Sequence, residues 1–298
     1  MNNFLQFYQH IPEQINPEII HVGFFSVGWY SVMYLAAFFV VFRLLKLRLR
    51  LGEGEELFKN TLGVDGKNKL KKQEGLILDF LYFCFLGVVI GGRLGYVLFY
   101  NLPFYLAHPL AIISPFDLAT GELVGIYGMS YHGGLIGVLL ATSLFVRFYK
   151  LNFWVLSDFI VPAIPAGYLF GRIGNFLNGE LYGRVTDMWI GMYFSSDVLG
   201  ALRHPSQLYE AVLEGFLLFW IFWKIRNKKI VRGKLLGLYL IGYAFARFIG
   251  EFFREPDTQM GFFWGYFTLG QLFSFAMLVG GLVFVFYERR RCAIIKQC

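Results

Sequence analysis

Polar residues that could do chemistry gather in a few short motifs of a chain that is otherwise apolar. The densest is GRIGNFLNGELYGR, residues 171–184, which combines two guanidiniums, two amides and one carboxylate with four glycines. Glycine lets the backbone approach a ligand closely, and so many polar groups beside an apolar segment are typical of a functional site. The alternative is a hydrogen-bonded network that closes the end of a helix.

Arginines close to apolar segments are the second signal. Six of the 27 Lys and Arg residues lie outside the basic loops, each in or beside a polar motif: Arg93, Arg172, Arg184, Arg203, Arg247 and Arg254. Because a guanidinium keeps its proton, near a bilayer it persists only with an anion, a water-filled cavity or a carboxylate partner. An anionic, membrane-derived substrate is therefore our first hypothesis. Arg93 could instead bridge helices, whereas Arg184 and Arg203 fall in a wetter segment and should tolerate substitution better.

A further motif, RFIGEFFREPD, covers residues 247–257. Arg247 and Glu251 are four residues apart, so both project from one face of a helix. They could form a structural ion pair, or Glu251 could orient Arg247 toward a phosphate. Arg254 could contact the same ligand or belong to a polar turn.

Two histidines and one tyrosine complete the set of candidates. His132, in GMSYHGG, could act as a general base near neutral pH or could cap and pack a helix start. His204 opens the motif HPSQLYE, which resembles a helix N-terminal region, and is a weaker candidate. Tyr30 is either an interfacial aromatic residue or a hydroxyl of the site.

The elements that must position these residues are membrane helices. The chain is 57% hydrophobic and only 16% charged, whereas about a quarter of a soluble domain is charged. Stretches of roughly 20 apolar residues predict an all-α integral membrane protein with about seven spans. They cover residues 23–45, 76–100, 132–149, 154–172, 207–224, 234–252 and 265–287.

The distribution of charge predicts the orientation. The 21 remaining cations fall on one side if the N-terminus is outside and the C-terminus inside, and segments 1–22 and 101–131 contain no Lys or Arg. By the positive-inside rule the topology is N-out, C-in. We expect a single membrane domain over residues 1–298, with a cytoplasmic loop at 46–75 and an outer polar segment at 175–206. The formal charge of +7 then reflects orientation, and no nucleic-acid partner is expected.

Several other classes of protein are disfavoured. The chain has neither a Cys-x-x-Cys pair nor a His-Glu-x-x-His helix, so we expect no metal and no cofactor. An organic-anion transporter would show internal repeats, but the likeness of residues 92–95 to 171–174 ends after four residues. A retinal protein is disfavoured because residues 265–287 contain no Lys.

Taken together, these motifs resemble a known family. Residues 171–183 resemble the signature of the bacterial prolipoprotein diacylglyceryl transferases, and His132-Gly133-Gly134, residues 204–207 and residues 247–257 resemble its other characteristic stretches in the same order. The resemblance extends from about Tyr30 to the last span. The charged loop at 51–74 departs from the family pattern because it is longer.

The resemblance implies a transferase of the bacterial inner membrane whose active site faces the outer side. Such an enzyme moves the diacylglyceryl group of phosphatidylglycerol to the lipobox cysteine of a prolipoprotein signal peptide and releases glycerol phosphate. The family's important positions correspond to Tyr30, His132, Arg172, Asn175, Glu180, Gly183, Arg247 and Glu251. Arg172 and Arg247 suit the phosphate because a guanidinium can bind two oxygens at once. His132 is the first choice for the base, with Glu251 or an arginine-stabilised thiolate as alternatives. Arg93, His204 and Arg254 are further candidates for substrate binding.

Overall fold

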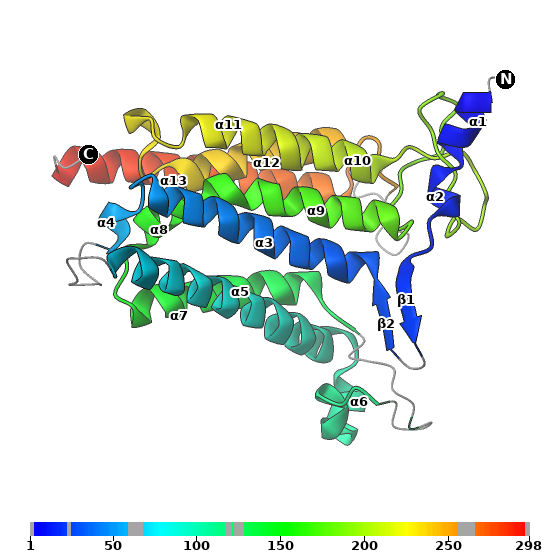
Figure 1. Ribbon diagram of the computed structural model, residues 1–298, viewed down its shortest axis with the longest axis horizontal. Coiled ribbons are helices and arrows are strands. Elements are labelled where there is room, and N and C mark those ends of the chain that lie inside the picture. The colour runs from blue at the N-terminus through cyan, green and yellow to red at the C-terminus, as the bar shows by residue number, and fades with distance from the viewer. Residues whose placement is uncertain are drawn as a thin grey trace. The chain divides into compact units, whose positions relative to one another are not determined.

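The computed structural model describes residues 3–22, 25–58, 68–116, 121, 128–255 and 266–295. The chain divides into two compact units, residues 1–45 with 154–298 and residues 46–153. Helices dominate both units (Figure 1). Three of the described helical segments are long and apolar enough to cross a membrane: Lys69–Tyr100, Phe153–Leu177 and Leu269–Tyr287.

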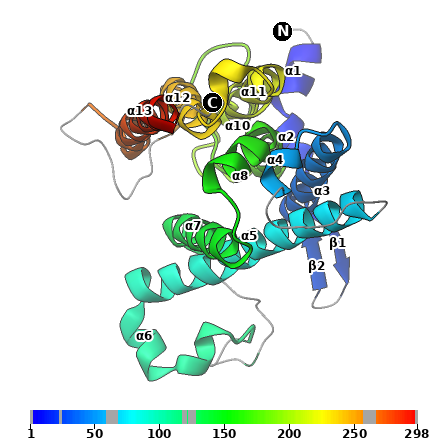
Figure 2. The same ribbon diagram turned by 90° about the vertical axis from the view of Figure 1, so that its left-hand side faces the viewer.

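The first unit is a helical bundle with a small polar part at one end. Its elements are α1 (Asn3–Gln9), α2 (Ile11–Gln14), β1 (Glu18–Val22), β2 (Phe25–Gly28), the first part of α3 (Trp29–Arg50), α8 (Phe153–Ile160), η2 (Val161–Ala163), α9 (Ile164–Leu177), α10 (Ser206–Glu210), η3 (Ala211–Leu217), α11 (Leu218–Ile225), η4 (Lys229–Val231), α12 (Leu235–Gly250) and α13 (Leu269–Ile295). Strands β1 and β2 pair antiparallel. Helices α12 and α13 lie side by side in both views (Figures 1 and 2).

The helical run from α10 to α11 has apolar side chains on its exposed face and carboxylates on its buried face, as a membrane helix does. Val212, Phe216 and Trp220 recur every four residues and are exposed, whereas Glu210 and Glu214 are buried. A lipid-facing helix turns apolar side chains outward and keeps ionisable groups inside the bundle. From Ala211 to Leu217, a stretch that includes Glu214, the helix adopts the wider π form of η3, a feature frequent at functional sites.

The second unit is built on two closely packed helices, α5 (Lys69–Tyr100) and α7 (Tyr131–Phe148). It also contains α4 (Glu55–Phe58), α6 (Leu102–Ala107) and η1 (Pro109–Ile112). Glycines spaced by four bring the α5 and α7 backbones together: a Cβ at Gly91 would lie 2.4 Å from the carbonyl oxygen of Gly133. Membrane helices associate through such small-residue faces. Gly133 therefore serves helix packing.

The seven expected spans coincide with helices over most of their length, but several helix ends differ from the expected ones by a few residues. Residues 25–28 form β2, so the first helix begins at Trp29 and not at residue 23. The expected loop at 46–75 is partly helical, because α3 continues to Arg50 and α5 already begins at Lys69. Lys, Glu, Leu and Arg are good helix formers, so both helices extend beyond their apolar parts.

The polar segment 175–206 folds back on residues 8–10. The backbone N–H of Tyr193 donates to Gln9, the Tyr8 hydroxyl donates to the carbonyl of Ile190 at 3.2 Å, and the His10 ring stacks on Tyr193. Residues 8–10 are thus tied to the rest of the first unit by tertiary contacts.

Candidate functional site

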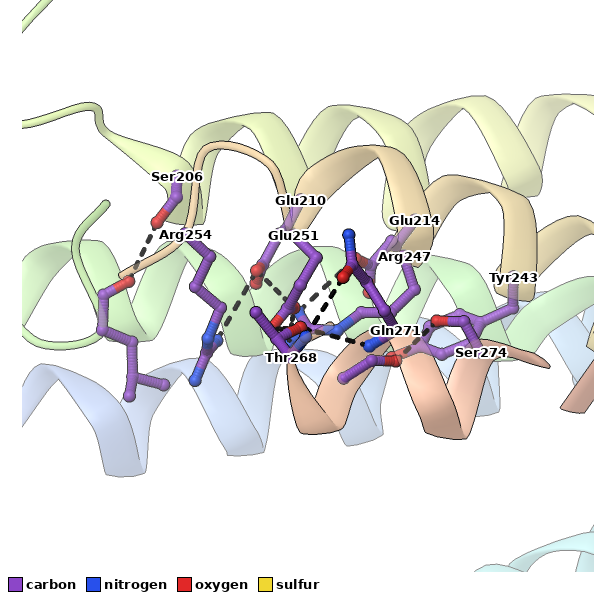
Figure 3. A network of polar contacts seen from close by, with 12 residues as sticks. Ser206, Glu210, Glu214, Tyr243, Arg247, Glu251, Arg254, Thr268, Gln271 and Ser274 are labelled. Carbon is purple, nitrogen blue, oxygen red and sulfur yellow. Dashed lines mark hydrogen bonds and ion pairs between the residues drawn. The ribbon is translucent and has the colours of Figure 1, made fainter. Parts of the chain in front are cut away.

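The centre of the candidate site is the buried carboxylate of Glu210, at the end of α10 (Figure 3). Its Oε2 lies 2.9 Å from Nε of Arg172, and its Oε1 lies 2.6 Å from Nη1 of Arg247. Nη1 of Arg254 approaches the same Oε1 at 3.5 Å. One carboxylate therefore gathers three arginines from α9, α12 and the segment after α12.

The α9 side of this cluster is held by side chains on one helical face. Tyr168, Arg172 and Asn175 are spaced by four and three residues, so they stack along that face. Nε of Arg172 donates to the Tyr168 hydroxyl oxygen at 2.7 Å, and its Nη1 donates to Oδ1 of Asn175 at 3.3 Å. Asn175 in turn donates to Glu180 at 2.8 Å. This chain of contacts fixes the plane of the Arg172 guanidinium.

A second buried carboxylate, that of Glu214, lies beside Tyr168. The Tyr168 hydroxyl donates to Oε2 of Glu214, and the Tyr243 hydroxyl lies 3.3 Å from that of Tyr168. Oε1 of Glu214 is buried, has no hydrogen-bond partner among the described residues and lies 3.8 Å from Nη1 of Arg247. Glu214 thus adds negative charge between the two arginines.

Arg247 is held from its own helix by Glu251. Its Nη2 lies 2.7 Å from Oε2 of Glu251, as the four-residue spacing predicted. The other Glu251 oxygen accepts from the Thr268 hydroxyl at 3.0 Å. A Cβ at Gly270 would lie 2.6 Å from that carboxyl group, so a larger residue there would displace the Glu251 side chain.

The charges of this cluster balance. Three guanidiniums, those of Arg172, Arg247 and Arg254, meet three buried carboxylates, those of Glu210, Glu214 and Glu251. Burial of charge is costly unless the charges are paired and hydrogen-bonded. The arginines are therefore tolerated through carboxylate partners, one of the three explanations that the sequence left open.

Gly183 and His204 are brought together by the backbone at the edge of this cluster. The Gly183 N–H donates to the His204 carbonyl at 2.8 Å, and Gly183 also forms a bridge with Arg254. A Cβ at residue 183 would lie 2.3 Å from the carbonyl oxygen of Phe253, so this close approach requires glycine. The His204 side chain lies 3.2 Å from the Tyr209 hydroxyl, and burial lowers the pKa of His204.

Tyr30 packs against the signature helix within the first unit. A Cβ at Gly174 would lie 3.3 Å from the Tyr30 ring, which brings the start of α3 close to α9. The Tyr30 hydroxyl is 2.9 Å from that of Tyr34. Tyr30 is therefore a neighbour of the helix that carries Arg172 and Asn175.

The two remaining candidates, His132 and Arg93, belong to the second unit. The exposed His132 stands in the first turn of α7, after the cap in which Ser130 accepts from the Gly133 N–H. Arg93 is buried and donates to the carbonyls of Ile112 at 2.8 Å and Ala111 at 2.7 Å. These contacts favour the structural reading of Arg93, because they tie α5 to the segment that follows it.

Arg203 is buried, which contradicts the expectation that it lies in a solvent-exposed segment. Its guanidinium is buried and donates to both oxygens of Asp197, at 2.8 and 2.9 Å, above the Tyr182 ring. These hydrogen bonds lower the pKa of the Asp197 carboxyl group. The sequence shows which residues of this polar segment are charged but not which are buried. The segment folds around its own ion pair, Asp197 with Arg203.

Glu210 and Glu214 are the site residues that sequence reasoning did not single out. Both are carboxylates inside the expected span 207–224, four residues apart on one helical face. The signal was available, because an ionisable residue in an apolar span is unusual whatever its sign. Tyr168 carried no such signal, since tyrosine is common in membrane helices near the interface.

Comparison with known proteins agrees with the motifs and extends over nearly the whole chain. The family model for prolipoprotein diacylglyceryl transferase matches residues 17–287. A protein of Chlorobaculum tepidum named phosphatidylglycerol–prolipoprotein diacylglyceryl transferase is 44% identical over 98% of this chain and 96% of its own length. Proteins with the same name from Campylobacter curvus (40% identical, 97% of this chain and 98% of the relative) and Bordetella avium (41%, 93% and 96%) are similar too. The chain belongs to the prolipoprotein diacylglyceryl transferase family.

Proposed function

We propose that this protein transfers the diacylglyceryl group of phosphatidylglycerol to the lipobox cysteine thiol of prolipoproteins. The family match over residues 17–287 supports this reaction. The single structural observation that carries it is the buried cluster of Arg172, Arg247 and Glu210 within apolar helices. It offers guanidinium donors at a place where only a membrane lipid, or a peptide inserted in the membrane, arrives readily.

The reaction forms one carbon–sulfur bond and breaks one carbon–oxygen bond. The thiolate sulfur attacks the terminal glycerol carbon of the diacylglyceryl group, and the bond from that carbon to the phosphate oxygen breaks. Glycerol phosphate leaves as a phosphate monoester, and the thiol proton passes to a base. The leaving phosphate gains negative charge in the transition state, so preorganised cations near it lower the barrier.

Arg172 and Arg247 would supply those cations. Each guanidinium carries five N–H donors, and the contacts to Glu210, Glu251 and Tyr168 engage only some of them. The carboxylates hold the two planar groups in place while the remaining N–H groups face the phosphate. Binding of a monoanionic phosphodiester would give the charge-balanced cluster a net negative charge, which opposes ionisation of a thiol nearby, so a base outside the cluster must take the thiol proton.

His132 remains our choice for that base. A neutral imidazole can accept the thiol proton and return it to solvent after transfer. Asn175, Glu180 and Gly183 would shape the site through the contacts that fix Arg172 and Arg254, while Tyr30 would bound it along α9. Arg93, His204 and Arg254 complete the proposed set, with Arg93 acting through the segment that it anchors.

We place the enzyme in the bacterial inner membrane as one membrane domain of seven spans, N-terminus out and C-terminus in. The basic groups at 43–72, 147–150, 224–234 and 289–296 support this orientation. The outer polar segment 175–206 and the motifs around Arg172 and Arg254 would then face the side where the prolipoprotein emerges. A lipobox cysteine lies at the outer end of a signal peptide, so donor and acceptor would meet at that side.

The test uses the purified full-length protein, phosphatidylglycerol and a synthetic lipobox peptide. We expect one glycerol phosphate released per thioether formed, and no product from a peptide with serine in place of the cysteine. Stoichiometric release of diacylglycerol without peptide modification would instead indicate a lipase, and transport of the lipid without bond cleavage would indicate a carrier. Either result would overturn the proposal.

A further inference from the structure

A cavity of about 270 Å³ lies in the second unit and shares no residue with the cluster around Glu210. It is bounded by the end of α3, the turn after it and the start of α5. Its lining residues are Leu49, Arg50, Gly52, Gly54, Glu55, Lys69, Leu70 and Gln73. A water molecule occupies about 30 Å³ in the liquid, so the cavity could admit a group much larger than one water.

The turn that forms one wall is rigidly held. The buried Arg48 and Glu53 side chains pair at 2.6 Å, and the Glu53 N–H donates to the Arg48 carbonyl at 3.0 Å. Gly52 adopts a φ of +77°, which favours glycine. The wall is thus preorganised and does not need a ligand to form.

The opposite wall is the N-terminus of the 32-residue helix α5. The first four N–H groups of a helix have no partner within it, and the N-cap residue Asn68 makes no side-chain cap here. Lys69 and Leu70, the first two residues of α5, both line the cavity. A helix N-terminus with free N–H groups favours an anion.

Gln73 supplies an independent reason to expect a ligand. It is only 5% exposed and lines the cavity one turn into α5. No hydrogen bond joins its side-chain amide to any residue in the described part of the chain. The Gln73 amide atoms are not among the buried side-chain atoms without a partner in the described residues, so they remain accessible and can bond to a group that enters the cavity.

The charges around the cavity also favour an anion. Arg50 and Lys69 line it, against the single carboxylate of Glu55. That carboxylate is 76% exposed and lies 3.9 Å from Lys69, and Arg50 is 3.8 Å from Glu74. Both pairs are long and solvated, so each contributes little. The cations therefore retain donors for a ligand, whereas Glu74 makes its short contact, 2.6 Å, with Lys46.

We propose that this cavity binds a phosphate group, with Lys69, Arg50, the Gln73 amide and the first N–H groups of α5 as its donors. The apolar walls Leu49 and Leu70, at the ends of two apolar helices, fit the headgroup of an anionic phospholipid. The site would hold a lipid that is not the donor of the transferred group. Its existence does not depend on the proposed reaction.

The experiment measures amide hydrogen exchange in the full-length protein, because exchange reports on residues 69–73 separately from any lipid held elsewhere. Nanodiscs of phosphatidylcholine alone are compared with nanodiscs that contain phosphatidylglycerol, and with phosphatidylcholine nanodiscs to which inorganic phosphate is added. We expect exchange at residues 69–71 to slow by roughly tenfold with the anionic lipid, as a hydrogen bond to a charged group implies. Equal slowing with inorganic phosphate would assign the site to phosphate in general, and slowing with the lipid alone would assign it to the headgroup.

Two double variants, each of which removes two positive charges, serve as the test and its control. Arg50→Gln with Lys69→Gln removes the two lining cations, whereas Lys71→Gln with Lys72→Gln removes two exposed cations of the same helix that do not line the cavity. The first should abolish the slowing and the second should retain it. A third variant, Gln73→Leu, keeps the side-chain volume and should weaken the slowing. Unchanged exchange in the unmodified protein, or an equal loss in both double variants, would overturn the proposal.

Discussion

At the scale of single residues, the main feature is that Glu210 binds the arginines that the sequence assigned to a phosphate. Its two oxygens contact Arg172 at 2.9 Å and Arg247 at 2.6 Å. A carboxylate that holds two guanidiniums fixes their positions before substrate arrives, so less reorganisation is needed in the transition state. A phosphate must then either displace Glu210 from the two guanidiniums or bind to their remaining N–H groups.

The arginines give the first prediction. Loss of a charge-assisted contact that strengthens in the transition state costs about 2–4 kcal/mol, or roughly 30- to 1,000-fold in rate. We expect losses of that size for Arg172→Gln and Arg247→Gln, and smaller ones for the Lys variants, which keep the charge but lose the planar fork. Glycerol phosphate release is measured at matched membrane levels, with the exposed Arg43→Gln as control. Near-normal turnover of both Gln variants would make these arginines structural.

Tyr168 gives the second prediction. Its hydroxyl accepts from Arg172 and donates to Glu214, so Tyr168→Phe should lower kcat by about 1–2 kcal/mol, roughly five- to thirty-fold. Because the tyrosine acts through Arg172, the loss should be much smaller in an Arg172→Lys background. Tyr243→Phe, which loses one contact of 3.3 Å, should cost less. Additive effects in the double variant would show that Tyr168 acts independently of the arginine.

His132 gives the third prediction. If it removes the thiol proton, His132→Ala and His132→Gln should both be severely impaired. Their residual rate should rise with pH as the peptide thiolate forms unaided, around its ordinary pKa of about 8.5. The rate is followed from pH 6 to 9 with the lipobox peptide. If the Gln variant retains most activity with a flat profile, the base lies elsewhere.

At the scale of elements, the polar segment 175–206 is a loop tied by buried polar contacts. Asp197 and Arg203 form its central pair, and the close backbone contact at Gly183 joins it to the end of α12. Glu210, the last residue of α10, and Glu214, within the π segment η3, are both buried. Both carboxylates thus lie on the buried face of this helix, whose exposed face is apolar.

The Asp197–Arg203 pair gives the fourth prediction. Removing one partner leaves the other charge buried and unpaired, so Arg203→Gln should destabilise the segment by about 1–3 kcal/mol, whereas the half-buried Arg184→Gln should cost less. Because the Asp197 pKa is lowered in the folded state, its contribution is present above the unfolded value of about 3.9 and is lost as pH falls through the folded pKa. Hydrogen exchange at residues 197–203 is measured from pH 7 to 3. Equal exchange in the two variants, without a rise toward low pH in the unmodified protein, would contradict it.

At the scale of the whole molecule, the polar cluster and the α3–α5 turn are separate features of different units. The cluster draws its members from residues 168–271, whereas the cavity is formed by residues 49–73. The two can therefore be changed independently. Because the two features share no residue, a longer charged loop at 51–74 can be present without changing the Glu210 cluster.

The loop gives the fifth prediction. Replacing residues 51–68 by a Gly/Ser linker, with Arg48→Met so that no charge is left buried, should leave glycerol phosphate release within about twofold, since no contact of the Glu210 cluster is removed. The same variant should lose the lipid-dependent slowing of exchange at the start of α5, because one wall of the cavity is gone. An inactive variant that still inserts normally would show that the loop takes part in transfer.

Composition and spacing determined the class of protein, the approximate helices, the four-residue pair of Arg247 with Glu251 and the motifs that carry the family. These features follow from local rules: apolar length measures a span, and helical periodicity places side chains on one face. Only the tertiary structure decided that Glu210 and Glu214 neutralise the arginines, that Tyr168 holds Arg172, and that Arg203 is buried. Partners distant in sequence meet through helix packing, and the cost of burying charge decides which of them pair.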